Sequence, residues 1–170
     1  MVKKSKARGR TSALGASGVA LAVLTACAGP FQYYEGTGLH DATVAELAGK
    51  WENIEETRLT LRRDGTAAFQ QLDGENFDFE EGWRLSGTGT WELTDDADGQ
   101  DVRVVMTTRT GIKTRVPTTA TATATATEPP ATYSWRFYVR RDPDAALELF
   151  FFYGDPDIGN TYVMKRGATH

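Results

Sequence analysis

The amino-acid sequence predicts an all-β domain of about eight short strands in an antiparallel up-and-down barrel, preceded by a short N-terminal helix. From Gly49 onward, apolar residues recur at a period of two, as in strands with one buried face. Turn residues at hairpin spacing separate these runs, and no long stretch has a helical period. We therefore place one barrel domain at residues 44–170, because closure of the sheet removes exposed strand edges.

A helix of one or two turns is expected at the start of this domain. Asp41 as an N-cap, or Thr43 with Glu46 as a capping box, precedes the segment 44–48. Gly49 then has the place of a C-cap. These signals predict a helix too short to form a layer of its own.

The first three strands are predicted at 49–53, 58–63 and 66–72. Asp64-Gly65 is a hairpin signal, because both residue types tolerate positive φ. The segment 73–87 is acidic and resembles a loop, yet Phe77, Phe79 and Trp83 are too apolar for a fully solvated one. We interpret these aromatic residues either as a lid over the open end of the barrel or as a patch for a partner.

Five more strands follow, at 89–93, 102–106, 133–140, 147–153 and 161–166. An acidic turn at 95–101 joins the first two of them. The Thr/Ala-rich segment 117–131 is predicted as an exposed, disordered loop. Because Thr and Ala alternate there at the strand period, a protruding two-stranded ribbon is the alternative.

The N-terminus has the pattern of a secretory signal. Residues 1–10 carry five basic side chains, and residues 11–25 are uncharged and mostly apolar or small. The apolar part is shorter than the ~20 residues that a helix needs to cross a ~30 Å hydrocarbon core. The residues Leu24-Thr25-Ala26-Cys27 resemble the lipobox of bacterial lipoproteins, in which an apolar residue and two small or hydroxylated residues precede an invariant Cys.

The lipobox resemblance implies that residues 1–26 are removed as a signal peptide and that Cys27 receives a thioether-linked diacylglycerol. Two acyl chains suffice for stable anchoring, so the protein is expected on the extracytoplasmic face of a bacterial cell membrane. Residues 27–43 would be its tether, with Phe31, Tyr33 and Tyr34 either at the membrane interface or docked on the domain. Cys27 is the only cysteine, so no disulfide is expected.

The charge of the chain limits its partners. There are 19 Lys plus Arg and 23 Asp plus Glu, and removal of the five basic residues of the leader leaves 14 basic against 23 acidic residues, a net charge of −9. An acidic domain argues against nucleic acid as a partner and against purely electrostatic attachment to anionic lipid.

A second resemblance is to the lipocalins and the wider calycin group. A short helix precedes Gly49-Lys50-Trp51 at the start of the first strand, and the last strand carries Arg166. The chain departs from the family pattern in its middle motif and its C-terminal helix, neither of which we can match. The resemblance implies that Trp51 closes one end of the barrel and that Arg166 packs across it beside Gly49.

The inner strand faces are rich in aromatic residues, and their role leaves two functions open. These residues are Phe69, Trp91, Trp135, Phe137, Phe151 and Tyr153. If they leave a space, an eight-stranded barrel can hold one small apolar or amphipathic ligand. If they fill the interior as a core, the protein is a non-catalytic envelope module that binds a protein partner through its surface.

Residues suited to catalysis are few, and we predict neither an enzyme nor a bound metal or cofactor. The histidines are His40, in the tether, and His170, the last residue printed, so no Ser/His or Cys/His pair and no zinc site is expected. The acidic cluster Glu52, Glu55 and Glu56 is interpreted as a solvated strand end. The Asp-rich segments 95–101 and 155–160 lack the residue spacing of an EF-hand calcium loop.

Overall fold

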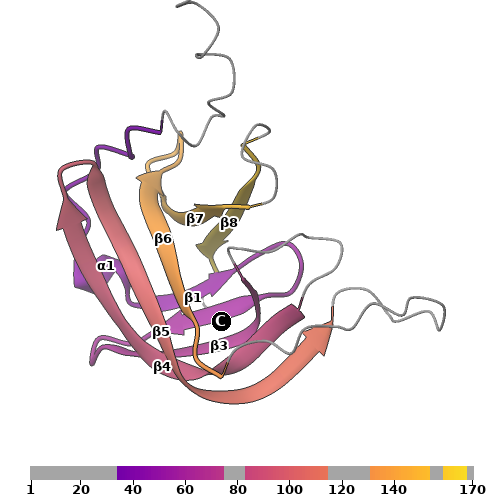
Figure 1. Ribbon diagram of the computed structural model, residues 1–170. Helices are drawn as coiled ribbons and strands as arrows, with labels where there is room; N and C mark the ends of the chain where they lie inside the picture. Colours follow the sequence, from indigo (N-terminus) through magenta and orange to yellow (C-terminus); the bar gives the residue numbers. More distant parts are fainter. Residues whose placement is uncertain (1–33, 75–82, 115–130, 154–158, 168–170) are drawn as a thin grey trace, which may run out of the picture.

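The computed structural model describes residues 34–74, 83–114, 131–153 and 159–167, which form a closed barrel of eight antiparallel strands (Figure 1). Each strand pairs with its neighbour in the chain. The ring closes between the first and last strands, where Trp51 lies opposite Arg166 and Glu52 opposite Lys165. The predicted all-β up-and-down barrel with a short N-terminal helix is confirmed. Closure pairs the first strand with the last, whereas residues 107–114 of the fifth strand pair, within the described part of the chain, with the fourth strand only.

The elements lie at the predicted runs of alternating residues, but the fourth and fifth strands, with 14 and 16 residues, extend well beyond the predicted runs 89–93 and 102–106. They are helix α1 (Val44–Leu47) and strands β1 (Gly49–Glu52), β2 (Arg58–Leu61), β3 (Thr66–Asp73), β4 (Trp83–Asp96), β5 (Gly99–Thr114), β6 (Ser134–Arg141), β7 (Leu147–Phe152) and β8 (Thr161–Arg166).

The helix begins with a capping box rather than at Asp41. The Thr43 hydroxyl accepts a hydrogen bond from the Glu46 backbone N–H at 3.2 Å, and the Glu46 carboxylate accepts one from the Thr43 N–H at 2.9 Å. The C-cap is Ala48. The sequence predicted Gly49 as the C-cap, and this prediction is wrong, because Gly49 is the first residue of β1.

The predicted loop over 73–87 is wrong at both ends, because β3 continues to Asp73 and β4 begins at Trp83. Two register pairs explain the extension. Leu72 and Leu85 are both fully buried, and the neighbouring Asp73 and Arg84 form an ion pair. The acidic turn predicted at 95–101 is also shorter than expected, because Asp95 and Asp96 pair with Gln100 and Gly99 across the hairpin.

The strand directions define two ends of the barrel. At the first, which we call the closed end, lie α1 and the turns that join β2 to β3, β4 to β5 and β6 to β7. At the other, which we call the loop end, lies the turn 53–57 between β1 and β2. Strands β3, β5 and β7 also finish at the loop end.

Several predictions concern residues outside the described part of the chain. These are the signal peptide 1–26, the lipidated Cys27, the lid residues Phe77 and Phe79, and all but the last residue of the Thr/Ala-rich segment. They stay predictions.

Candidate functional site

At the closed end, the structure brings together Gly49, Trp51 and Arg166. The Trp51 ring is fully buried, and its indole N–H donates to the Leu47 carbonyl at 2.9 Å. The Arg166 guanidinium lies over this ring, 4.5 Å from its centroid, and donates to the Ala48 carbonyl at 3.0 Å. Partial burial lowers the pKa of Arg166. The planar guanidinium of Arg166, stacked on the Trp51 ring, thus covers the closed end of the barrel.

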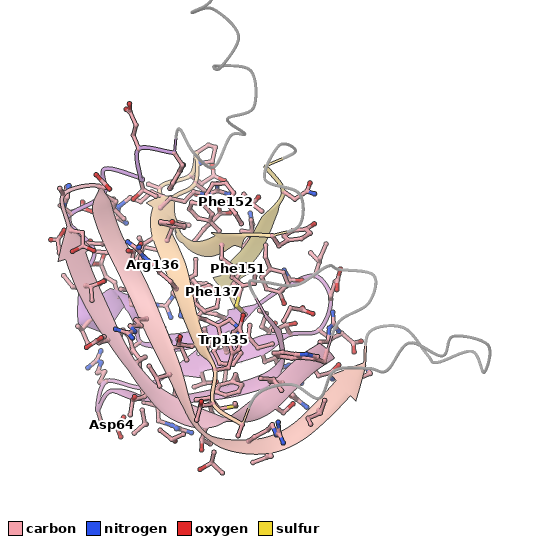
Figure 2. All side chains as sticks on the ribbon, viewed as in Figure 1. Asp64, Trp135, Arg136, Phe137, Phe151 and Phe152 are labelled. Carbon is pink, nitrogen blue, oxygen red and sulfur yellow. The ribbon has the colours of Figure 1, made fainter. Side chains whose placement is uncertain are left out.

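The six aromatic residues proposed as a ligand cavity do not share one environment. Phe69 and Trp135 are buried with ring centroids 4.9 Å apart, and Phe137 and Phe151 are buried with centroids 5.4 Å apart. Figure 2 shows Trp135, Phe137 and Phe151 within the ring of strands. These four rings pack against one another and are part of the hydrophobic core.

The other two lie at opposite ends. Trp91 is at the closed end, where its indole N–H donates to the Arg62 carbonyl at 2.7 Å in the turn between β2 and β3. Tyr153 directly follows β7 at the loop end and is half-buried against the core. The loop end is therefore where an inner aromatic residue remains partly open to solvent.

The loop end also holds a buried ionic cluster that the sequence did not predict. The Arg84 side chain is only 10 % exposed, and its Nε lies 3.2 Å from a carboxylate oxygen of Asp73, whose side chain is fully buried. Its other nitrogens donate to Glu55, to the backbone carbonyl at 3.2 Å and to the side-chain carboxylate. One carboxylate from the β1–β2 turn and one from the end of β3 thus converge on one guanidinium, the arrangement that keeps a buried charge compensated.

Hydrogen bonds from other strands hold this ionic cluster. The Tyr162 hydroxyl on β8 donates to the Thr57 hydroxyl at 2.6 Å, and Thr57 donates to the Gln71 carbonyl at 2.8 Å. Burial, followed by the negative charge of Asp73, raises the pKa of Tyr162 far above its usual value. The indole of Trp135 donates to the Asp73 carbonyl at 2.6 Å. These hydrogen bonds therefore connect Asp73 and the residues next to the cluster with buried side chains of β6 and β8.

Half-buried aromatic rings lie next to the cluster. Trp83, the residue before Arg84, packs edge-on against Tyr133 with centroids 5.5 Å apart, and Tyr133 contacts Trp135 at 4.7 Å. Trp83 was predicted as part of a lid, but it is the first residue of β4. We call Trp83, Tyr133 and Tyr153, together with Glu55, Arg84 and Asp73, the mouth site. It offers apolar ring faces beside a compensated ionic group, a combination that suits an amphipathic molecule.

The sequence offered a weak signal for this site. Asp73 begins the segment 73–87 that was interpreted as a loop, and Arg84 lies inside it. Their pairing depends on a register shift between Phe69 and Leu72. Glu55 belongs to the cluster interpreted as a solvated strand end, and its side chain is 36 % exposed. Its neighbour Glu52 follows the prediction more closely, since it is exposed and 3.7 Å from Arg58.

The remaining candidates lie away from the mouth site. His40 Nδ1 lies 2.6 Å from Asp95 Oδ1 at the closed end. A depression of about 290 Å³ lies against β4, β5 and β6, lined by Thr94, Asp96, Arg103, Ser134, Trp135 and Arg136. Arg136 there already pairs with Asp101 and lies 3.6 Å from Asp96. Within the described ranges, no group of three or more His, Cys, Asp or Glu is placed to hold a metal ion.

No helix in the described ranges is long and apolar enough to cross a bilayer. A comparison of this chain with protein-family models, with curated proteins and with solved structures finds no match.

Proposed function

We propose that this protein is a lipid-anchored, extracytoplasmic barrel that binds a small apolar or amphipathic molecule at its loop end. The observation that carries the proposal is the mouth site, where the half-buried rings of Trp83 and Tyr133 adjoin the Glu55–Arg84–Asp73 cluster. Exposed aromatic faces beside a small number of placed polar groups are typical of ligand sites. The ligand would lie at the mouth rather than in the middle of the barrel, because Phe137 and Phe151 occupy the middle.

The two ends of such a ligand have different neighbours. An apolar part would lie on Trp83 and Tyr133, and burial of apolar surface contributes roughly 25 cal/mol per Å². A polar group of the ligand would contact Glu55, the cluster member whose side chain is 36 % exposed. Binding is favoured over catalysis, because both carboxylates of the cluster are already engaged by Arg84.

The membrane anchor in this proposal rests on the sequence Leu24-Thr25-Ala26-Cys27. A diacylglycerol on Cys27 would supply attachment that a domain of net charge −9 could not obtain from anionic lipid. Treatment of cells with an inhibitor of lipoprotein signal peptidase should cause the uncleaved precursor to accumulate. Normal processing in the presence of the inhibitor would contradict this part of the proposal.

Ligand binding is tested by native mass spectrometry of residues 28–170, expressed without the leader and incubated with a lipid extract of cell envelopes. We expect a retained small molecule that is released on unfolding, and weaker retention by a Trp83→Leu variant. Trp91→Leu is the matched control, because Trp91 is also a tryptophan on β4 but lies at the closed end. Equal loss in both variants would contradict a site at the mouth.

The alternative is a non-catalytic envelope module with a filled core that binds a protein partner. The close packing of Phe69, Trp135, Phe137 and Phe151 favours this alternative. Protein that stays empty in the same experiment, with no thermal shift from lipids or hydrophobic dyes, would contradict ligand binding. Affinity capture from envelope extracts would then be the next experiment.

A further inference from the structure

The outer wall of the barrel carries a cluster of aromatic rings that are not part of the hydrophobic core inside the barrel. It consists of Tyr34, Tyr138 on β6, and Phe150 and Phe152 on β7, which we call the wall patch. Tyr34 lies 5.0 Å from the Tyr138 ring and 4.9 Å from the Phe152 ring, between centroids. Phe150 is buried beneath them, whereas the other three are half-buried and keep part of their surface in solvent.

The segment that brings Tyr34 to this wall is fastened to the barrel. The Gly38 N–H donates to the Asp98 carbonyl at 3.0 Å, and the Gln100 N–H donates to the Leu39 carbonyl at 2.8 Å. The Gln100 side chain accepts from the Ala42 N–H at 2.8 Å and donates to its carbonyl at 3.1 Å. Of the two alternatives left open for Tyr34, the ring contacts support docking on the domain. Tyr34 therefore has a defined place on the β6–β7 wall.

The distance from this point to the proposed lipid anchor is short. Cys27 precedes Tyr34 by seven residues, and a fully extended chain covers at most ~3.6 Å per residue, so the reach is about 25 Å. Strand β5 alone has 16 residues, or roughly 50 Å at ~3.3 Å per residue. Because the link is about half the length of the longest strand, it holds the barrel close to the membrane surface, with the β6–β7 wall near it.

The chemistry of this wall fits a lipid headgroup layer. The Arg136 guanidinium lies 5.4 Å from the Tyr138 ring centroid, and that of Arg140 lies 4.5 Å from the Phe150 centroid. These cations have carboxylate partners on the same wall, since Arg136 pairs with Asp101 and both Arg140 Nε and the 66 % exposed Lys165 Nζ lie 2.9 Å from Glu148. Aromatic rings with partly open faces concentrate at membrane interfaces, so the rings, rather than the paired cations, carry the fit to a headgroup layer.

We propose that the wall patch rests on the headgroup region of the membrane, so that the barrel lies with its β6–β7 wall against the lipid. This inference rests on the lipid anchor of the proposed function and adds an orientation to it. Phe152 is the last residue of β7 at the loop end, so the mouth site would open beside the bilayer rather than far from it. An amphipathic molecule could then pass between lipid and barrel over a short path.

The test uses the full chain, processed and lipidated in a bacterial host, and reconstituted in phosphatidylcholine/phosphatidylglycerol vesicles. Since lipidation blocks the thiol of Cys27, one introduced cysteine can carry an environment-sensitive fluorophore. Thr161→Cys places it beside Phe152, its register partner. Gln70→Cys is the matched control, because Gln70 is also exposed but lies on β3, three strands away from β8 around the ring.

We expect the label at Thr161 to emit at shorter wavelength on vesicles, to be quenched by spin-labelled lipid, and to be several-fold less accessible to iodide than the label at Gln70. Tyr34→Ser with Phe152→Ser should abolish that protection while circular dichroism and vesicle flotation stay unchanged. Equal accessibility at both positions in protein that floats would overturn the orientation and leave the anchor intact. Protein that does not float with the vesicles would overturn the anchor and the orientation together.

Discussion

The closed end allows a sharp test of how Gly49, Trp51 and Arg166 depend on one another. Gly49 has φ +147°, a conformation that L residues rarely adopt, and a Cβ there would overlap the Arg166 guanidinium. A Gly49→Ala substitution should therefore strain the backbone and displace Arg166 from the Trp51 ring. The backbone strain is a cost at residue 49 itself, whereas the displacement of Arg166 removes the contacts of that side chain with Trp51 and Ala48.

The magnitude follows from the separate contributions. A non-glycine residue in such a backbone conformation costs about 1–3 kcal/mol. Loss of the Arg166 contact with the Trp51 ring costs roughly 0.5–2 kcal/mol, and loss of its hydrogen bond to the Ala48 carbonyl costs about 1 kcal/mol. We expect a decrease of about 3–5 kcal/mol in the free energy of unfolding. This is a large share of the ~5–15 kcal/mol typical of a domain, and the melting temperature should fall by roughly 10–15 °C.

The assay is urea unfolding followed by tryptophan fluorescence and circular dichroism. Gly38→Ala is the matched control, because Gly38 also has positive φ (+64°) but nothing lies within 4 Å of its added Cβ. That variant should lose only about 1–2 kcal/mol. In an Arg166→Ala background, Gly49→Ala should reduce the free energy of unfolding only by the cost of the backbone conformation, since the added Cβ no longer overlaps a guanidinium. If Gly49→Ala and Gly38→Ala lose the same stability, Arg166 does not depend on Gly49 and the reasoning is refuted.

Three further predictions concern charged and titrating groups. Arg84→Met should destabilise the domain by about 3–5 kcal/mol in urea unfolding, because Asp73 would remain buried without its partner; a loss below about 1 kcal/mol would contradict the buried ionic cluster. Burial, with a contribution from Tyr138, raises the pKa of Tyr34 to about 12 from 10.0. A raised folded-state pKa means stability that is present below pH 10 and is lost toward pH 12, so the melting temperature should fall more steeply over that window in the wild type than in Tyr34→Phe; parallel curves would argue against docking of Tyr34. Burial opposes ionisation of Glu148, but hydrogen bonds led by that from Lys165 outweigh it and lower its pKa below 4.5. The stability that Glu148 contributes should therefore be lost as pH falls below about 4.5, and Glu148→Gln should show a flatter acid profile in thermal unfolding.

The strands could be predicted because their signals are local. Trp135, Phe137 and Val139 alternate with polar residues on β6, and burial of one face follows from that alternation alone. Acidic and glycine-containing turns separate such runs at hairpin distances, so an up-and-down order was the simplest arrangement. The pairing of Thr43 with Glu46 also acts over three residues, and it correctly predicted the start of α1.

The mouth site could not be predicted in the same way. Asp73 and Arg84 are separated by 11 positions along the chain but are register partners in the sheet. Their pairing depends on the irregularity between Phe69 and Leu72, which no alternation pattern reveals. In the sequence the segment 73–87 resembles a loop because it is acidic, although its aromatic residues are too apolar for a fully solvated one.

The sequence by itself determined that this protein is a barrel of short antiparallel strands, because turn chemistry and alternation at a period of two act between near neighbours. The resemblance of Leu24-Thr25-Ala26-Cys27 to a lipobox is likewise a property of a linear motif, and the lipid anchor that it implies is part of our proposal. Only the tertiary structure decided that Tyr34 docks on the outer wall and that Glu55, Asp73 and Arg84 meet at the loop end. These contacts join segments that are far apart in the sequence, and their energies depend on burial, which no single segment possesses before the others have packed around it.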